Sequence, residues 1–144
     1  MFGKPLISKH EQALIVKSIE SAELKTSGEI RVHIENNCSG DPVERAVLIF
    51  NKLKMYETAE RNGVLIYVAL KSHKFSIIGD IGIDSRVPEN FWDSVKSEIA
   101  THFGKGEIIT GISSAVELSG NKLGEFFPRK DNDINEQSND VSFG

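Results

Sequence analysis

Residues 63–79, "GVLIYVALKSHKFSIIG", decide the fold of this chain. The stretch begins with a continuous apolar run that contains β-branched and aromatic side chains, a pattern typical of a central strand covered on both faces. The polar residues 71–74, "KSHK", then form a short turn, and "FSIIG" at 75–79 returns as a second strand. Because the turn is short, the two strands are predicted to form an antiparallel hairpin.

A strand and a helix precede this hairpin. Residues 29–35, "EIRVHIE", alternate apolar and polar side chains, which predicts a half-buried strand with His33 on its exposed face. Residues 41–55 follow as a helix with Asp41 as its N-cap. Strand, helix and strand over residues 29–70 form a βαβ unit, so the first two strands should be parallel, with a right-handed crossover.

Further helices flank these strands. One begins near Ser8, one opens at Pro88 and Glu89, and one spans residues 108–123. A central strand covered on both faces needs helices on both sides of the sheet. The predicted fold class is therefore α/β, a three-layer αβα sandwich around a small mixed central β-sheet of about four strands. The fourth strand is expected at a sheet edge, at a position that the sequence leaves open.

The chain is predicted to divide into one domain and a tail. Residues 1–128 carry the periodic apolar patterns and are long enough to bury a core. Residues 129–144 are polar and are predicted to form a disordered C-terminal tail.

Composition and charge exclude several classes of protein. The net charge of −4 argues against general binding to nucleic acid or to anionic membranes, which both favour a basic surface. The single cysteine, Cys38, excludes an internal disulfide framework and a cysteine-based zinc site, and we interpret it as a loop residue. No stretch resembles a signal peptide or a transmembrane helix, so we expect a monomeric, cytoplasmic protein.

Carboxylates gather at one end of the predicted sheet. The second strand of the hairpin runs antiparallel to the first, so the loop after residue 79 should lie near residues 57–63 and near the start of the earlier strand. A hard divalent cation, Ca²⁺ or Mg²⁺, as one ion or two, is the natural partner for such a group of oxygen atoms. The predicted metal ligands are Asp80, Asp84, Glu89, Glu29, Glu60 and Asn62.

The same carboxylates also have interpretations without a metal. Arg61 and Arg86 are able to neutralise them as ion pairs. Glu89 suits the first turn of a helix through the helix dipole, and Asp80 or Asp84 is able to hold a turn. These alternatives stay open at the level of the sequence.

Other motifs in the sequence do not indicate a catalytic or metal-binding site. Asp41 and Glu44 lie at the opposite end of the first strand and are assigned to helix capping. Residues 131–135, "DNDIN", imitate an EF-hand loop but lack its glycine and its final glutamate, so we reject that interpretation. No Ser–His–acid set can be assembled, because the four histidines all have ordinary surface contexts.

Several stretches together resemble the TPM domain family, also described as thylakoid lumen phosphatase-like. The resemblance covers about residues 8–127, and it implies an αβα sandwich. The shared features are the Asn-Gly before the central strand and the loop "GDIGID" at 79–84, in which Gly-Ile-acid ends the motif. The stretches that carry it are "SGEIRVHIE" (27–35), "RNGVLIYVAL" (61–70), "FSIIGDIGID" (75–84), "VPENFWDSV" (87–95) and "FGKGEIITGI" (103–112).

The resemblance also implies a site and an activity. Plant relatives are associated with photosystem repair, acid phosphatase activity and Ca²⁺ binding at the acidic sheet end. On that pattern Asp84, Glu89, Asn62 and Glu29 match the acidic and amide positions of the family. This chain departs from the pattern because Arg61 replaces an acidic residue, Asp80 is an additional acid, and no signal peptide or membrane anchor is evident.

Three functional hypotheses follow. The first is a Ca²⁺- or Mg²⁺-binding domain that stands alone and has a regulatory or protein-interaction role toward an unknown protein partner. The second is a metal-assisted acid phosphatase. The third is an interaction module whose tail recruits a partner and whose acidic site is purely structural.

Overall fold

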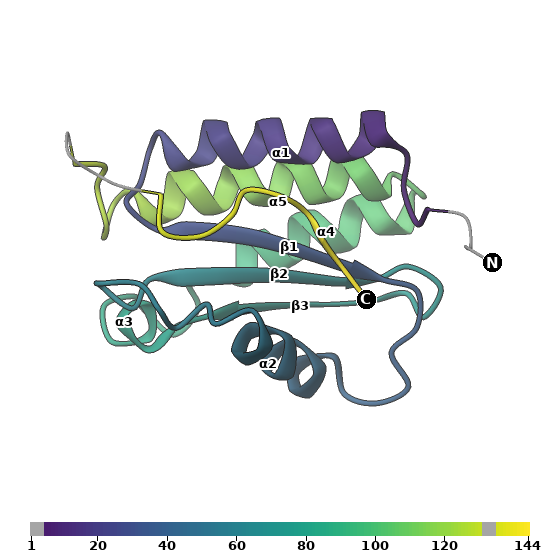
Figure 1. The fold of residues 1–144 in the computed structure, drawn as a ribbon, viewed down its shortest axis with the longest axis horizontal. Helices are drawn as coiled ribbons and strands as arrows, with labels where there is room; N and C mark the ends of the chain where they lie inside the picture. Colours follow the sequence, from purple (N-terminus) through teal and green to yellow (C-terminus); the bar gives the residue numbers. More distant parts are fainter. Residues whose placement is uncertain (1–4, 131–134) are drawn as a thin grey trace.

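A four-stranded sheet lies between two helical layers in the computed structural model, which describes residues 5–130 and 135–144 (Figure 1). The sheet has the strand order β3-β2-β1-β4. The strands are β1 (Glu29–Glu35), β2 (Gly63–Ala69), β3 (Lys74–Gly79) and β4 (Ser142–Phe143). The helices are α1 (Lys9–Glu23), α2 (Pro42–Lys52), α3 (Ile81–Asp84), α4 (Asp93–Gly104) and α5 (Ile108–Leu123).

The strand directions define two ends of the sheet. β1 and β2 are parallel, with Glu29 opposite Gly63, and β2 and β3 are antiparallel, with Val64 opposite Gly79. The starts of β1 and β2 and the end of β3 therefore meet at one end, which we call the amino end. Glu35 lies at the other end, which we call the carboxyl end. The predicted βαβ unit and hairpin are confirmed.

Helices cover both faces of β2, as its apolar sequence predicts. Helices α1, α4 and α5 lie on one face, and α2 lies on the other (Figure 1). Every residue of β2 is buried. The larger core lies under α1, α4 and α5, and the smaller core lies under α2 and includes Phe50 and Tyr67. The three-layer α/β sandwich is thus confirmed.

The acidic loop and the segment after it differ from the prediction. Residues 81–84 form the short helix α3, which Asp80 caps by accepting a hydrogen bond from the backbone N–H of Ile81 at 2.8 Å. Pro88 does not open the next helix, because residues 88–92 form a turn in which Phe91 N–H donates to Pro88 O at 3.0 Å. Helix α4 begins only at Asp93, so the predicted helical setting of Glu89 is wrong.

The predicted half-buried character of β1 is also wrong, because residues 135–144 cover its edge (Figure 1). These residues belong to the segment that the sequence predicts to be disordered, and they end in β4, which pairs in parallel with His33 and Ile34. His33 is only 3% exposed rather than a surface residue. Its ring contacts Ser142 and Glu35, so a Ser–His–acid set does exist in the fold.

None of the helices in the described parts of the chain is long and apolar enough to cross a lipid bilayer. The stretch "DNDIN", which was weighed as an EF-hand loop, begins at residue 131, and its first four residues lie outside the described residues.

Candidate functional site

Two loops close the amino end of the sheet by direct backbone contact. Asp80 N–H donates to Gly63 O, and Gly82 N–H donates to Arg61 O, both at 2.9 Å. A side chain at Gly82 would collide with the carbonyl oxygen atoms of Glu60 and Arg61. The loop after β3 therefore lies against residues 57–63, as the strand directions predict.

Asp80 is satisfied by protein groups. Its carboxylate is 5% exposed and receives two hydrogen bonds from Arg61, from Nε at 2.7 Å and from Nη2 at 3.0 Å. The hydrogen bonds to Asp80 raise the pKa of Arg61, so the guanidinium stays charged. The ion-pair interpretation thus accounts for Asp80, and Arg61 is already engaged.

Asp84 and Glu89 both have exposed side chains, on α3 and on the turn that follows it. The predicted gathering of five carboxylates is not found: among the described residues no three Asp, Glu, His or Cys side chains are grouped so that they could hold a metal ion. Because residues 88–92 form a turn, Glu89 does not lie in the first turn of a helix, where the sequence predicts it.

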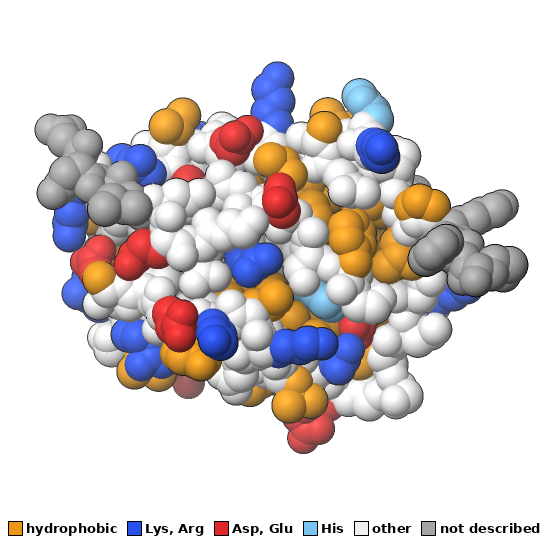
Figure 2. All heavy atoms as spheres, in the orientation of Figure 1, with side chains coloured by type: hydrophobic (Ala, Val, Ile, Leu, Met, Phe, Trp, Pro, Cys, Tyr) orange, Lys and Arg blue, Asp and Glu red, His pale blue; other side chains and the backbone are white. Residues whose placement is uncertain are grey.

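Glu60 lies among basic side chains. Its carboxylate accepts a hydrogen bond from Ser27 Oγ at 3.1 Å, and Arg86 and Lys130 approach it at 3.9 and 3.5 Å. Figure 2 shows acidic and basic side chains intermixed on the end of the molecule where α3 lies. Positive charge therefore offsets much of the acidic character that the sequence predicts here.

Glu29 and Glu23 form a buried carboxyl pair. They are 3% and 7% exposed, respectively. Glu23 Oε2 accepts a hydrogen bond from Ile30 N–H at 3.0 Å. Glu29 accepts one from the backbone N–H of Glu136, in the segment that covers β1. Burial raises the pKa of Glu23 to about 8, with a further rise from the neighbouring Glu29. Burial also raises the pKa of Glu29. The pair therefore retains a proton at neutral pH.

Asn62 is 1% exposed and lies next to this pair, because its backbone oxygen accepts from Glu29 N–H at 3.3 Å. Its side-chain Nδ2 lies 3.4 Å from Ser27 Oγ, the same hydroxyl that contacts Glu60. Its Oδ1 is buried and has no hydrogen-bond partner among the described residues. A buried amide oxygen without a donor costs about 1–3 kcal/mol, so this atom can gain from a cation or a bound water molecule.

Sequence reasoning missed Glu23 because it lies in the last turn of α1, outside the loops of the sheet. A signal was present: a carboxylate at a helix C-terminus is unfavourable toward the helix dipole, which hints at a role other than helix stability. Of the six predicted ligands, the structure brings Glu29, Glu60 and Asn62 into one neighbourhood. Asp80 is engaged by Arg61, and Asp84 and Glu89 are exposed.

The fold and this oxygen-rich end define a small α/β sandwich domain, and comparison with known proteins places it in a family. A family model described as the TPM domain matches residues 4–122, so the chain belongs to the TPM domain family. The resemblance read from the sequence is therefore confirmed. Among curated proteins the comparison finds no match.

The solved structures that are similar to this chain include the following two. The BA42 protein from the psychrophilic bacterium Bizionia argentinensis is 40% identical, with a TM-score of 0.92; the match covers 98% of this chain and 97% of that one. The N-terminal domain of cg2496 protein from Corynebacterium glutamicum is 13% identical, with a TM-score of 0.62, over 96% of this chain and 80% of that one. The second likeness shows the shared fold alone.

Proposed function

We propose that this TPM domain binds a hard divalent cation, Ca²⁺ or Mg²⁺, at the amino end of its sheet. The observation that carries the proposal is the buried, unpartnered Oδ1 of Asn62 beside carboxyl groups that retain a proton. The groups proposed to coordinate the ion directly are the carboxyl pair Glu23 and Glu29 and the amide oxygen of Asn62, and Glu60 is proposed to lie in the outer coordination sphere. The set contains oxygen donors and no sulfur, which is the chemistry that these two ions prefer.

The ion would take the place of the proton that Glu23 and Glu29 share. Because these groups have raised pKa values, a cation would have to displace that proton in order to bind. Since no three carboxylates are grouped among the described residues, the ion would keep several water molecules, as Mg²⁺ usually does. One ion at this place is the simplest form of the proposal.

Calorimetric titration of chelator-stripped protein with Ca²⁺ and with Mg²⁺ tests the proposal. We expect Glu29→Gln to weaken binding at least tenfold, and Glu89→Gln to leave it unchanged. Titration in two buffers of different ionisation enthalpy should reveal a proton released at pH 7. Absence of binding heat with both ions, or an equal loss in the two variants, contradicts the proposal.

We further propose a regulatory or protein-interaction role for the domain rather than catalysis at this end. A phosphatase would need a free basic group for the phosphate, and both Arg61 nitrogens that face Asp80 are already engaged. Hydrolysis of p-nitrophenyl phosphate that depends on Ca²⁺ or Mg²⁺ and disappears in Glu29→Gln would favour the phosphatase instead. The monomeric state and the cytoplasmic location remain predictions from the sequence.

A further inference from the structure

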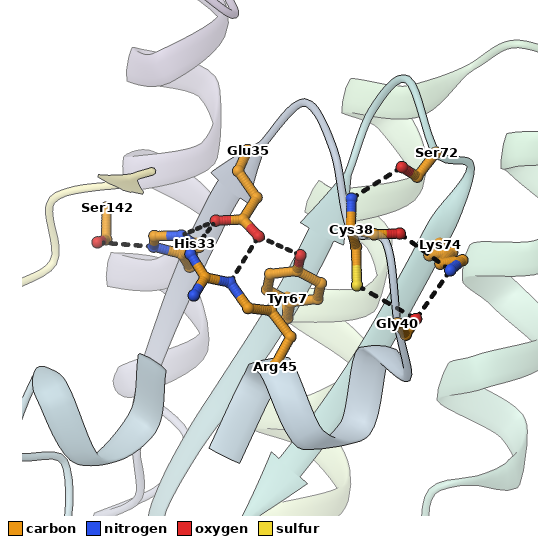
Figure 3. A network of polar contacts seen from close by, with 9 residues as sticks. All are labelled: His33, Glu35, Cys38, Gly40, Arg45, Tyr67, Ser72, Lys74 and Ser142. Atoms are coloured by element: carbon orange, nitrogen blue, oxygen red, sulfur yellow. Dashed lines mark hydrogen bonds and ion pairs between the residues drawn. The ribbon is translucent and has the colours of Figure 1, made fainter. Parts of the chain in front are cut away.

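At the carboxyl end of β1, a serine, a histidine and a glutamate lie in line (Figure 3). β4 places Ser142 directly across from His33, so the two side chains share one face of the sheet. Ser142 Oγ lies 2.9 Å from His33 Nδ1, and His33 Nε2 lies 3.2 Å from Glu35 Oε1. This is the order of contacts found where a hydroxyl nucleophile, a base and an orienting acid work together.

The protonation states follow from the contacts of Glu35. Arg45 donates to its carboxylate from Nε and from Nη2, both at 2.9 Å, and the Tyr67 hydroxyl donates to it as well. The hydrogen bonds from Arg45, above all, lower the pKa of Glu35 to about 2. An ionised carboxylate only accepts hydrogen bonds, so the proton of His33 lies on Nε2. Its Nδ1 is then left to accept the proton of the Ser142 hydroxyl.

The histidine is held firmly and is neutral. Its ring stacks on Tyr67, with the ring centroids 5.9 Å apart, and the residue is 3% exposed. Burial lowers the pKa of His33, so the ring is uncharged at neutral pH and is able to act as a base. Ser142 is only partly buried and can be reached from solvent.

A pocket of about 650 Å³ opens at the Glu35 end of this line; Glu35 and Gly144 line it, whereas Ser142 and His33 are not among its lining residues. Gly144 forms part of its wall, and a Cβ atom at that position would lie only 2.8 Å from His33 Nε2. Parallel strands often end at such hollows, where ligands of α/β proteins bind. The side chains that line the pocket include Glu35, Asp41, Glu44, Arg45 and Leu48.

We propose that Ser142, His33 and Glu35 form a second site, which hydrolyses carboxylic esters through an acyl-serine intermediate. Ser142 is the nucleophile, His33 is the base, and Glu35 is a positioning residue that fixes the ring of His33. The site lies at the opposite end of the sheet from the proposed cation site and does not depend on it.

The reaction can be written with every proton and every electron pair accounted for. The Ser142 Oγ–H bond breaks, its proton moves to His33 Nδ1, and Oγ forms a bond to the carbonyl carbon of the ester while the carbonyl π electrons move to oxygen. When the carbonyl re-forms, the alkoxide leaves and takes the proton from His33. His33 Nδ1 then takes a proton from water, the hydroxide adds to the acyl carbon, and the bond from that carbon to Ser142 Oγ breaks as His33 returns the proton to Oγ and the acid is released.

The charge of the pocket limits the substrate. Asp41 and Glu44 add negative charge to a wall whose single arginine is paired with Glu35. A dianionic phosphate monoester would be repelled, whereas a neutral or cationic ester would not. We therefore expect p-nitrophenyl glycinate to be hydrolysed faster than the anionic p-nitrophenyl hemisuccinate.

A fluorophosphonate probe, which forms a bond with activated serines, tests the nucleophile in the full chain. Mass spectrometry should locate the probe on Ser142. Labelling should fall at least a hundredfold in Ser142→Ala and in His33→Gln, the range that a positioned base contributes, and should persist in the control Ser138→Ala. An unlabelled Ser142, or equal labelling of Ser138, overturns the proposal.

A second pair of variants guards against loss of the fold. Ser142→Cys keeps the side-chain shape, and Ser138→Cys puts a thiol at an exposed position of the same segment. Iodoacetamide should alkylate the thiol at position 142 at least ten times faster, although it is less exposed, and His33→Gln should remove the difference. Alkylation that is equal at both positions, or slower at 142, shows that His33 only holds β4 in place.

Glu35 is tested through the pH dependence of labelling. Its charge raises the pKa of His33, while Arg45 and Lys52 act in the opposite direction. Glu35→Gln should therefore slow labelling and move the midpoint of its pH profile downward. A slower rate with an unchanged midpoint would mean that Glu35 only supports the fold, which contradicts its assigned role.

Discussion

Two glutamates of the same strand, Glu29 and Glu35, differ in protonation although they are equally buried. They are 3% and 4% exposed. Burial beside Glu23 raises the pKa of Glu29, whereas the two hydrogen bonds from Arg45 hold the pKa of Glu35 near 2. The comparison teaches that the partner, rather than the degree of burial, decides whether a buried carboxyl holds a proton.

The two ends of the sheet also differ in how they are closed. At the amino end, backbone packs on backbone around Gly82, where a Cβ would collide with carbonyl oxygen atoms. At the carboxyl end, the loop that contains Gly40 borders the pocket, and a Cβ on Gly40 would meet no atom within 4 Å. The amino end of the sheet is therefore closely packed, whereas the carboxyl end borders a pocket.

Alanine at the two glycines should show the largest difference between the ends. We expect Gly82→Ala to lower the free energy of unfolding by about 2–3 kcal/mol, because the new methyl group forces two loops apart. Gly40→Ala should cost nothing or stabilise by up to about 1 kcal/mol, through a less flexible unfolded chain. Urea denaturation of both variants measures this, and similar losses would show that the ends are equally packed.

Removing the arginine of the carboxyl end should have the next largest effect. Arg45→Ala leaves Glu35 buried with one charged partner gone, and we expect a loss of about 2 kcal/mol in the free energy of unfolding. The control is Arg86→Ala at the amino end, where the side chain lies 3.9 Å from Glu60 and packs over the Phe127 ring. That change should cost less than about 1 kcal/mol. A larger loss in the control would reverse the comparison.

The pH dependence of stability should show an effect with a defined sign. The folded protein binds the Glu23 proton more tightly than the unfolded chain does, because the folded-state pKa is raised from 4.5 to about 8. The free energy of unfolding should therefore fall as the pH rises from 4.5 through 8, by more than about 1 kcal/mol. Glu23→Gln should flatten this part of the profile in chelator-containing buffer. If the free energy of unfolding of the variant changes with pH as steeply as that of the unchanged protein, the proton is bound by a group other than Glu23.

The sequence predicts most of the fold because local patterns and strand directions act together. The apolar run of β2 and the short turn after it define a covered central strand and a hairpin, and both are present. The unpredicted features depend on contacts distant in sequence. β4 joins β1 through His33 and Ser142, which are 109 residues apart, and no pattern in the polar segment signals a strand.

The candidate site was predicted less well than the fold, for a related reason. The strand directions brought the loop with Asp80 to residues 57–63, as expected. They give no information on which carboxylate pairs with which arginine, and Arg61 engages Asp80. Glu23 escaped notice because its proximity to Glu29 depends on how α1 ends above the sheet. Side-chain pairing at a sheet end depends on tertiary packing. The periodic pattern of apolar residues in the sequence gives no information on that packing.

The pairing of residues 135–144 with β1 has a consequence for the chain during its synthesis. An uncovered strand edge offers unpaired N–H and C=O groups to other chains and promotes aggregation. During synthesis, β1 and β2 emerge long before residues 135–144, so the edge of β1 remains open until those residues emerge as well. Residues 135–144 therefore protect the edge of β1 from pairing with other chains, and they do so only late in synthesis. Chains cut or stalled before these residues should associate with one another through β1.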